Sequence, residues 1–289
     1  MSEAAAKTGG EPAVLVAIEQ FYPEKERILF DPLQYRFLPG GKRFLVSLLR
    51  PGFLRKWMVG AADKAAPGLW GGMLCRKCYI DEKLTDSAET IEQIVNLGAG
   101  LDTRLYRLPC VADIPAWELD QPENIEYKRR GISKALGKPP QNVNLVPIDF
   151  DTENLRDKLQ AAGYSPNKIT FFILEAVTQY LTEAGLRATF GFLSSAKSGS
   201  LITFTYTRKK FLDGIDLFNW PAGYKRFVKN KIFIFGMEPE DWPGFLAEYN
   251  WKIIEDIDYP SMADKYIKPS GRVLSADTQV ERMVFAVKD

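Results

Sequence analysis

Residues 91–104 read IEQIVNLGAGLDTR, a short apolar run that ends in a glycine-rich turn. An apolar run of this length is typical of a buried strand, and the glycines after it let the backbone turn sharply. Four more strand candidates follow, most of them separated by helix candidates: PAWELD (115–120), NVNLVPIDF (142–150), ITFFILEA (169–176) and GSLITFTYT (199–207). Strands that alternate with helices predict βαβ units and a parallel sheet that is covered on both faces.

Two further strand candidates, at 250–259 and 279–288, lie near the end of the chain and are candidates for an antiparallel edge. The sequence therefore predicts an α/β fold with a doubly wound, mostly parallel seven-stranded sheet. Ligands of such folds bind beyond the carboxyl ends of the strands.

The chain before the sheet predicts helices. Helical periodicity is found at about 13–22, 42–59 and 73–84, with Gly71-Gly72 expected to break the chain before the last of these. We expect residues 1–12 to be a disordered leader, residues 13–90 to be a helical segment that walls the site, and residues 91–289 to form the α/β domain.

A segment at about 208–242, between the fifth and sixth strands, is rich in aromatic residues and predicts a cap. These side chains are expected either to pack the core of the cap or to form a lid over an aromatic or apolar substrate, because such residues usually line pockets. A basic run at 128–130 is expected to be a solvated helix face rather than a phosphate contact.

Composition excludes several classes of protein. The formal net charge is +1, so nothing calls for a nucleic acid or an anionic membrane as partner, and no apolar run is long enough to span a bilayer. Without a hydrophobic signal segment, the expected location is the cytoplasm. Histidine is absent, which excludes catalytic triads with an imidazole base. Three cysteines and no histidine predict neither a disulfide framework nor a metal site.

Chemically informative residues follow the predicted strands. Gly98-Ala99-Gly100 follows the first strand, with Thr103 where a dinucleotide fingerprint has its third glycine, which favours a ligand without a pyrophosphate. Asp120 ends the second strand, where an acid can accept both hydrogen bonds of a ribose diol. The alternative for the glycines is an ordinary strand-to-helix turn.

Two more acids end the third and fourth strands. Asp149-Phe150 offers an acid and an aromatic ring that suit an adenine, although Asp149 alone also suits a helix N-terminus. Glu175 directly follows an apolar strand, where a carboxylate is costly unless it meets a partner such as a ligand ammonium group.

The chain resembles the leucine carboxyl methyltransferase superfamily, and most of all its branch of microbial and fungal small-molecule O-methyltransferases. The resemblance rests on motifs in the expected order: RILFDPLQYRFLPG (27–40), RKCYIDEKL (76–84), IVNLGAGLDTRLYRL (94–108), WELDQPENIEYKRR (117–130), LVPIDFD (145–151), LEAVTQYL (174–181), DKYIKPSGRVL (264–274) and VERMVFAVK (280–288). It implies a fold of the class I S-adenosylmethionine (SAM) methyltransferase type.

The resemblance also implies SAM as cofactor, S-adenosylhomocysteine as product, and a role for each matching position. Arg76 would hold the SAM carboxylate, and the turn Gly98, Ala99 and Gly100 would pass beneath the methionine part and the ribose. The remaining cofactor positions would be Asp120 on the ribose, Asp149 and Phe150 on adenine, and Glu175 near the ammonium group.

The implied reaction is O-methylation of a small-molecule carboxylate or phenol. We slightly favour a carboxylate over a phenol as the methyl acceptor, because a carboxylate is ionised at neutral pH and needs no base. A phenol would need a catalytic base such as Glu175 or Tyr206. The sequence departs from the family after the acid, where Thr178, Gln179 and Tyr180 are expected to shape a different substrate pocket.

Three alternatives stay open at the level of sequence. The chain could methylate the C-terminal carboxylate of a protein, or act as a non-methylating cyclase or binding scaffold, because fold does not fix function. A nicotinamide oxidoreductase is disfavoured by Thr103. The sequence makes no prediction of oligomeric state.

Overall fold

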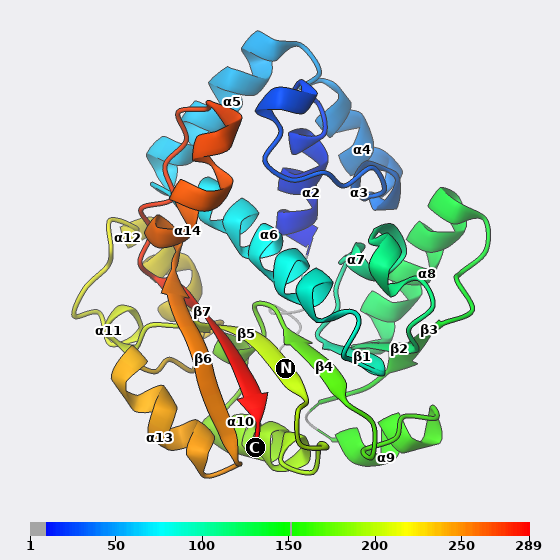
Figure 1. The fold of residues 1–289 in the computed structure, drawn as a ribbon. Coiled ribbons are helices and arrows are strands. Elements are labelled where there is room, and N and C mark those ends of the chain that lie inside the picture. Colours follow the sequence, from blue (N-terminus) through cyan, green and yellow to red (C-terminus); the bar gives the residue numbers. More distant parts are fainter. Residues whose placement is uncertain (1–9, 151) are drawn as a thin grey trace.

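The computed structural model describes residues 10–150 and 152–289 and contains a seven-stranded sheet in the order β3-β2-β1-β4-β5-β7-β6 (Figure 1). The strands are β1 (Gln93–Leu97), β2 (Ala116–Asp120), β3 (Val143–Pro147), β4 (Thr170–Leu174), β5 (Leu201–Thr207), β6 (Trp251–Asp258) and β7 (Glu281–Lys288). Strands β1 to β5 pair in parallel, and β7 is antiparallel to both β5 and β6. The predicted doubly wound sheet with an antiparallel edge is confirmed.

Helices cover both faces of the sheet because successive side chains of each strand point to opposite sides. In β1, Val95 and Leu97 pack with one face, where the covering helices are α9 (Leu155–Ala161), α10 (Glu183–Leu193) and α13 (Trp242–Ala247). Ile94 packs on the other face, against α6 (Leu69–Ser87), α7 (Arg104–Arg107) and α14 (Tyr259–Tyr266). Figure 1 shows α6 and α14 above the sheet and α9, α10 and α13 below it.

The remaining elements connect these layers. Helix α8 (Pro122–Leu136) follows β2, and short helical turns lie at η2 (Glu24–Glu26), η3 (Pro109–Val111), η4 (Thr178–Tyr180), η6 (Pro239–Asp241) and η7 (Lys268–Ser270). Ile132 and Ala135 of α8 pack against Phe37 of the N-terminal part of the chain.

The N-terminal segment is helical, as the pattern indicates, but its boundaries differ. Helix α2 (Gly10–Glu19) includes residues 10–12, which were expected in the disordered leader; an acid and a proline are both accepted in a first helical turn, and Ala13 behind them is buried. The remainder of the expected leader, residues 1–9, lies outside the described residues. Helix α3 (Gln34–Phe37) follows, and α2 supplies the largest share of the hydrophobic cluster of this segment, with further residues from α6 and the chain between them.

Two local predictions in this segment are wrong. The expected helix at 42–59 is two helices, α4 (Gly40–Ser47) and α5 (Gly52–Ala65), because Pro51 between them cannot continue a helix. Gly71-Gly72 does not break the chain but lies inside α6. A Cβ atom at Gly72 would lie 2.3 Å from the Tyr259 ring, and one at Gly71 would lie 2.2 Å from the Ser275 carbonyl oxygen, so both glycines permit close packing of α6.

The segment at 208–242 forms a cap with its own hydrophobic cluster. It contains α11 (Lys209–Leu212), α12 (Pro221–Gly223) and the π-helical turn η5 (Tyr224–Val228). Phe211, Phe227 and Phe233 form the buried centre of the cluster. Stacked and edge-on ring pairs join these aromatic residues, so the cap has a packed core of its own.

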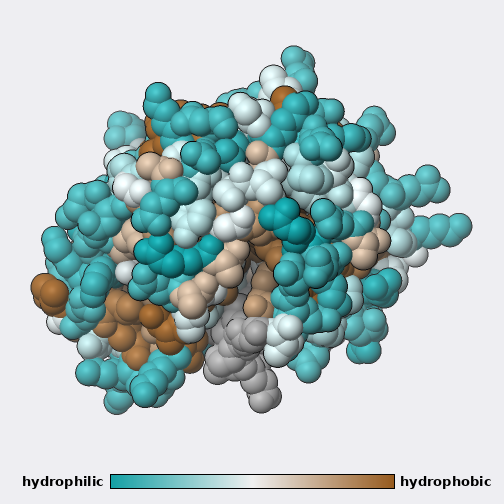
Figure 2. All heavy atoms as spheres, turned by 90° about the horizontal axis from the view of Figure 1, so that it is seen from below, coloured by the Kyte–Doolittle hydropathy of each residue, from teal (hydrophilic) through white to brown (hydrophobic). Residues whose placement is uncertain are grey.

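No helix in the described parts of the chain is long and apolar enough to cross a membrane. Seen from below the view of Figure 1, most of the surface is hydrophilic, with smaller hydrophobic areas between the polar side chains (Figure 2).

Lys128 does not lie on the solvated helix face that was expected for the basic run. Its ammonium group is fully buried and forms an ion pair with Glu118 of β2, which is also fully buried, at 2.5 Å between Nζ and Oε1. Arg129 and Arg130 remain exposed and pair with Glu126 on the same helix. The helical pattern could not reveal this because the partner of Lys128 belongs to the neighbouring strand.

Replacing Lys128 with Met should destabilise the protein by about 3–5 kcal/mol, because Glu118 would be left as an uncompensated buried charge. Urea denaturation of the variant measures this loss. The control Arg130→Met removes an exposed ion pair on the same helix and should change stability by less than about 1 kcal/mol. Equal losses of stability in the two variants would show that the buried ion pair stabilises the protein no more than the exposed pair does.

Candidate functional site

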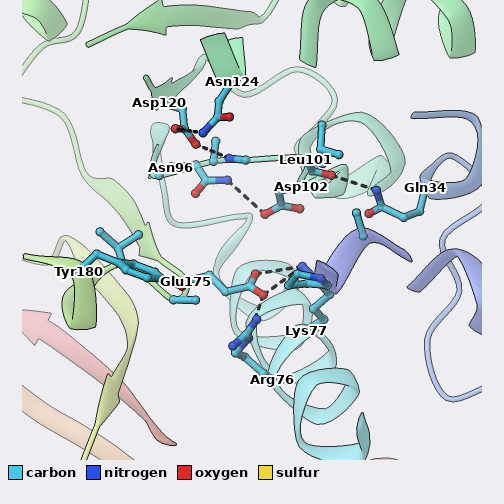
Figure 3. Close-up of a pocket in the computed structure, with 17 residues that line it drawn as sticks. Gln34, Arg76, Lys77, Asn96, Leu101, Asp102, Asp120, Asn124, Glu175 and Tyr180 are labelled. Carbon is cyan, nitrogen blue, oxygen red and sulfur yellow. Dashed lines mark hydrogen bonds and ion pairs between the residues drawn. The ribbon is translucent and has the colours of Figure 1, made fainter. Parts of the chain in front are cut away.

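A polar cavity lies beyond the carboxyl ends of β1, β2 and β4, and the N-terminal helices α2, α3 and α6 close it (Figure 3). Its lining residues come from all of these elements: Pro12, Ala13, Gln34, Arg76, Lys77, Asn96, Gly98, Ala99, Gly100, Leu101, Asp102, Asp120, Asn124, Glu175, Ala176, Val177 and Tyr180. Six of the predicted site residues therefore meet here, namely Arg76, Gly98, Ala99, Gly100, Asp120 and Glu175. The sheet brings them together from positions that are up to 99 residues apart in the sequence.

The turn after β1 needs its glycines for two different reasons. Gly98 and Gly100 have φ angles of 72° and 43°, in the left-handed region that side chains disfavour. A Cβ atom at Gly98 would also lie 2.5 Å from Cγ2 of Val177. The bare backbone therefore lets the end of β4 approach the turn closely and leaves the cavity open beside it.

Asp120 is fixed at the end of β2 by hydrogen bonds to both of its carboxylate oxygens. Oδ2 accepts a hydrogen bond from the backbone N–H of Gly100 at 2.6 Å, and Oδ1 accepts one from Nδ2 of Asn124 at 2.8 Å (Figure 3). The carboxylate consequently has one orientation and a polar neighbour on α8.

Glu175 lies at the end of β4 inside a buried cluster of cations. Its oxygens are 3.0 Å from Nε of Arg76, 3.0 Å from Nζ of Lys77 and 2.9 Å from Nη2 of Arg104. Arg104, which is fully buried, also pairs with Asp81 and Asp102. Figure 3 shows Glu175 pointing from β4 toward Arg76 and Lys77 on α6.

These cations decide the charge of Glu175. Burial by itself would raise the pKa of this carboxyl, but Lys77, Arg76 and Arg104 around it hold the pKa well below its usual range. The side chain is therefore a carboxylate at neutral pH and can attract a positively charged group of a ligand.

A second cavity, of about 330 Å³, adjoins the first and shares Pro12, Arg76, Ala176 and Tyr180 with it. Most of its lining is apolar or aromatic. The residues come from α2, the end of α5, α6, η4, β5, the cap, α14, and β7 with the segment before it: Glu11, Ala65, Ala66, Leu69, Met73, Gln179, Thr207, Trp220, Ala222, Gly223, Arg226, Phe227, Phe233, Tyr259, Thr278, Val280 and Glu281. The cap contributes Trp220, Phe227 and Phe233. Its aromatic residues thus both pack a core and line a cavity.

Arg76 lies on the border of the two cavities and contacts a carboxylate on each side. Nε donates to Glu175 in the polar cavity, and Nη1 donates to Oε1 of Glu281 in the apolar cavity at 2.8 Å. The hydroxyl of Tyr259 also donates a hydrogen bond to Glu281. Burial and the Glu281 carboxylate raise the pKa of Tyr259 well above its usual value, so this hydroxyl keeps its proton.

The structure does not bring Asp149 and Phe150 to the polar cavity. The backbone after β3 turns away, and the Phe150 ring packs against the core and lines a separate surface cavity with residues of α9 and α10. The predicted contacts of Asp149 and Phe150 with adenine would therefore require that the adenine lie outside the polar cavity.

Tyr206, which was predicted as a catalytic candidate, lines neither cavity. It is fully buried in β5, its ring packs against Trp242, and its hydroxyl donates a hydrogen bond to Asp256 at 2.8 Å. The prediction of a catalytic role is corrected for a simple reason: in β5, Tyr206 points to the face covered by α13, whereas Thr207 points to the cavity.

Sequence reasoning did not single out Lys77, Arg104 or Glu281 as site residues. Lys77 adjoins Arg76 in the sequence, and Arg104 directly follows the glycine-rich turn, so both carry a weak positional signal. Glu281 begins the last strand, and nothing near it in the sequence signals a role in the site. Only the β5–β7 pairing places it opposite Thr207. Gln179 and Tyr180 were expected to shape a substrate pocket, and both line the apolar cavity, whereas Thr178 is buried.

A model of the leucine carboxyl methyltransferase family matches residues 11–194, which is more than half of the chain. This chain belongs to the leucine carboxyl methyltransferase family. The matched range includes both the glycine-rich turn and Arg76 on α6, so the family resemblance seen in the sequence motifs is confirmed.

Curated relatives are similar over part of their length. A provisionally named S-adenosyl-L-methionine-dependent methyltransferase of Mycobacterium avium (strain 104) is 29% identical over 183 residues, which are 60% of this chain and 56% of the relative. A protein of the same name from Mycobacteroides abscessus is 29% identical over 224 residues, which are 75% of this chain and 73% of that protein. The chain spans about half the length of the first curated relatives it matches.

Two solved structures share the fold. A provisionally named methyltransferase from Thermobifida fusca YX has a TM-score of 0.56 at 16% identity, over 82% of this chain and 88% of the other. A DUF574 family protein from Streptomyces avermitilis has a TM-score of 0.55 at 13% identity, over 82% and 91%. These likenesses concern the fold alone and confirm the predicted class I SAM methyltransferase type of sheet.

Replacing Glu175 with Gln should destabilise the protein by about 3–5 kcal/mol near neutral pH, because three buried cations would lose their shared carboxylate. The folded pKa of Glu175 is lowered below 4.5, so its contribution is present above that pH and is lost as pH falls through the folded value. Urea denaturation between about pH 6 and pH 3 should therefore show a shallower loss of stability in the variant.

The control is Glu183→Gln, which removes an exposed i,i+4 pair with Arg187 and should leave the pH profile unchanged. Identical acid profiles for wild type and Glu175→Gln would contradict the assignment of a strongly stabilised carboxylate.

Proposed function

We propose that the chain is a SAM-dependent O-methyltransferase that acts on a small-molecule carboxylate or phenol. The observation that carries this proposal is the pair of adjoining cavities, one polar and one apolar, which share Arg76 and Tyr180 at their border. A methyl donor and its acceptor must lie in direct contact, and two cavities with a common border allow this. The curated relatives with SAM-dependent methyltransferase names support the same reading.

The polar cavity fits the chemical groups of SAM. The Asp120 carboxylate suits a ribose diol, and the glycine turn leaves room for the backbone to approach a ligand. The amino-acid part of SAM carries an ammonium and a carboxylate, and the cavity offers Glu175 to the first and the cations Arg76 and Lys77 to the second. The donor set thus contains a partner of the right sign for each charge.

When bound, SAM supplies a methyl group on a sulfonium that an oxygen nucleophile can displace. The chain's contribution is to hold the acceptor in line with the methyl group and to exclude water. Such alignment can lower the activation barrier by up to roughly 7–11 kcal/mol. The apolar lining from the cap and α6 suits this task, because it desolvates the acceptor.

SAM and S-adenosylhomocysteine should bind with micromolar affinity in calorimetric titration, and Asp120→Ala should weaken binding by about 10–100-fold through loss of charged hydrogen bonds. Asp113→Ala is the matched control, because Asp113 is an exposed acid just before β2, at the end of the strand opposite to Asp120, and lines neither cavity. It should bind SAM like the wild type. Circular dichroism checks that each variant is folded.

The outcome separates the alternatives. Folded wild-type protein that binds neither ligand would overturn the proposal, and binding lost in Asp113→Ala but kept in Asp120→Ala would overturn the site. Incubation with methyl-labelled SAM and either a metabolite extract or a proteome then distinguishes a small acceptor from a protein C-terminus. Binding without any labelled product or S-adenosylhomocysteine would favour a scaffold.

A further inference from the structure

Glu281 presents a carboxylate oxygen to the apolar cavity. Its Oε1 accepts hydrogen bonds from Arg76 and from the Tyr259 hydroxyl, and these two donors fix the carboxylate. In the described parts of the chain, no residue donates a hydrogen bond to Oε2. The side chain is 12% exposed and lines the cavity, so a bound ligand could reach this oxygen.

The cations of the apolar cavity are already paired with carboxylates of the protein. Arg76 pairs with Glu175 and Glu281, and Arg226 of the cap pairs with Glu11 of α2. Among the described lining residues there is accordingly no arginine or lysine without an acidic partner. A substrate carboxylate in this cavity would lie beside the carboxylate of Glu281, and two like charges that are close together in an apolar cavity repel each other.

The cavity lining also contains buried polar atoms that lack a partner. Within the described ranges, Oε1 of Gln179 is buried and accepts no hydrogen bond, and the hydroxyls of Thr207 and Thr278 are also buried without a partner. The backbone carbonyl of Gln179 accepts a hydrogen bond from Ile234 and thereby holds this residue against the cap. The carboxylate oxygen of Glu281 and the amide oxygen of Gln179 can accept a hydrogen bond from a hydroxyl but not from an ionised carboxylate, whereas the two threonine hydroxyls can donate as well as accept.

We propose that Glu281 is the general base of the reaction and that the apolar cavity selects a neutral hydroxyl on an aromatic ring, a phenol, over a carboxylic acid. The inference rests on the proposed methyl transfer and names its acceptor. Glu281 replaces both catalytic candidates suggested by the sequence, because Tyr206 lies in the core and Glu175 is held by three cations on the cofactor side.

The proposed step balances as follows. Oε2 of Glu281 takes the proton of the phenol hydroxyl as the phenol oxygen forms its bond to the methyl carbon. The bond between this carbon and the sulfonium breaks, and its electron pair stays on sulfur, so that S-adenosylhomocysteine leaves as a neutral thioether. Glu281 is left as a carboxylic acid and returns its proton to water after product release. General-base catalysis of this kind contributes about 10²–10⁴-fold to a rate.

The first test compares two probes with the same ring, 2-naphthol and 2-naphthoic acid, on the wild-type protein. Calorimetric titration in the presence of S-adenosylhomocysteine should show that 2-naphthol binds at least about tenfold more tightly, a difference of about 1.4 kcal/mol. With SAM, 2-naphthol should be methylated in preference. Tighter binding or faster methylation of 2-naphthoic acid would overturn the proposal, as would failure of both probes to bind.

The second test replaces Glu281 with Gln and follows acceptors of different acidity. The kcat for 2-naphthol should fall by about 100-fold or more, whereas 4-nitrophenol, which ionises near neutral pH without help, should lose less than about tenfold. Glu281→Asp withdraws the carboxylate from the acceptor and should also slow 2-naphthol. An equal loss on both phenols would assign Glu281 a structural role and overturn the proposal.

Asp256→Asn is the matched control. Asp256 on the neighbouring strand is held by Arg282 and by the Tyr206 hydroxyl, just as Glu281 is held by Arg76 and Tyr259, but it lines neither cavity. This variant should keep the activity of the wild type on both phenols. If Glu281→Gln fails to bind S-adenosylhomocysteine, the comparison of 2-naphthol with 2-naphthoic acid on the wild-type protein still tests whether the cavity selects a phenol.

Failure of this inference differs from failure of the proposed function. A wild-type protein that binds SAM and methylates 2-naphthoic acid rather than 2-naphthol retains the methyltransferase function but excludes the phenol-selective base. A wild-type protein that binds neither SAM nor S-adenosylhomocysteine overturns both.

Discussion

The guanidinium group of Arg76 joins the two halves of the site. Its Nε forms an ion pair with Oε1 of Glu175 at the end of β4, at 3.0 Å. On the other side, its Nη1 forms an ion pair with Oε1 of Glu281 at the start of β7, at 2.8 Å. Without Arg76, Glu281 would lose its buried cationic partner, whereas Glu175 would keep Lys77 and Arg104. The polar cavity, the apolar cavity and the antiparallel edge of the sheet therefore meet at one side chain of α6.

Close packing around glycine makes this meeting point possible. Gly72 lets α6 lie against the Tyr259 ring, and Gly98 lets the turn after β1 lie against Val177. A methyl group at either position would push apart elements that hold opposite walls of the site. The same absence of side chains that leaves space for a ligand thus also determines how tightly the helical segment sits on the sheet.

The order of the patterns was sufficient to predict the sheet, because each strand is short, apolar and followed by a turn or helix signal. The residues at the ends of β1, β2 and β4 could also be predicted, since the fold alone brings strand ends together. Asp149 and Phe150 could not be placed in this way, because the path of the chain after β3 depends on packing against α9 and α10. Glu281 is paired with Arg76 of α6 and Lys128 with Glu118 of β2, and the pattern within one element does not reveal a partner that belongs to another element.

The link between Arg76 and Glu281 spans 205 residues of sequence. Contacts of such separation form late, since the loop between them must close before they stabilise anything. During synthesis, α6 and the parallel strands emerge from the ribosome long before β7 does, and Arg76 can meanwhile pair with Glu175 but not yet with Glu281. Completion of the substrate side of the site is therefore coupled to addition of the last strand, so a nascent chain that still lacks β7 has its glycine turn but an open edge where the acceptor would lie.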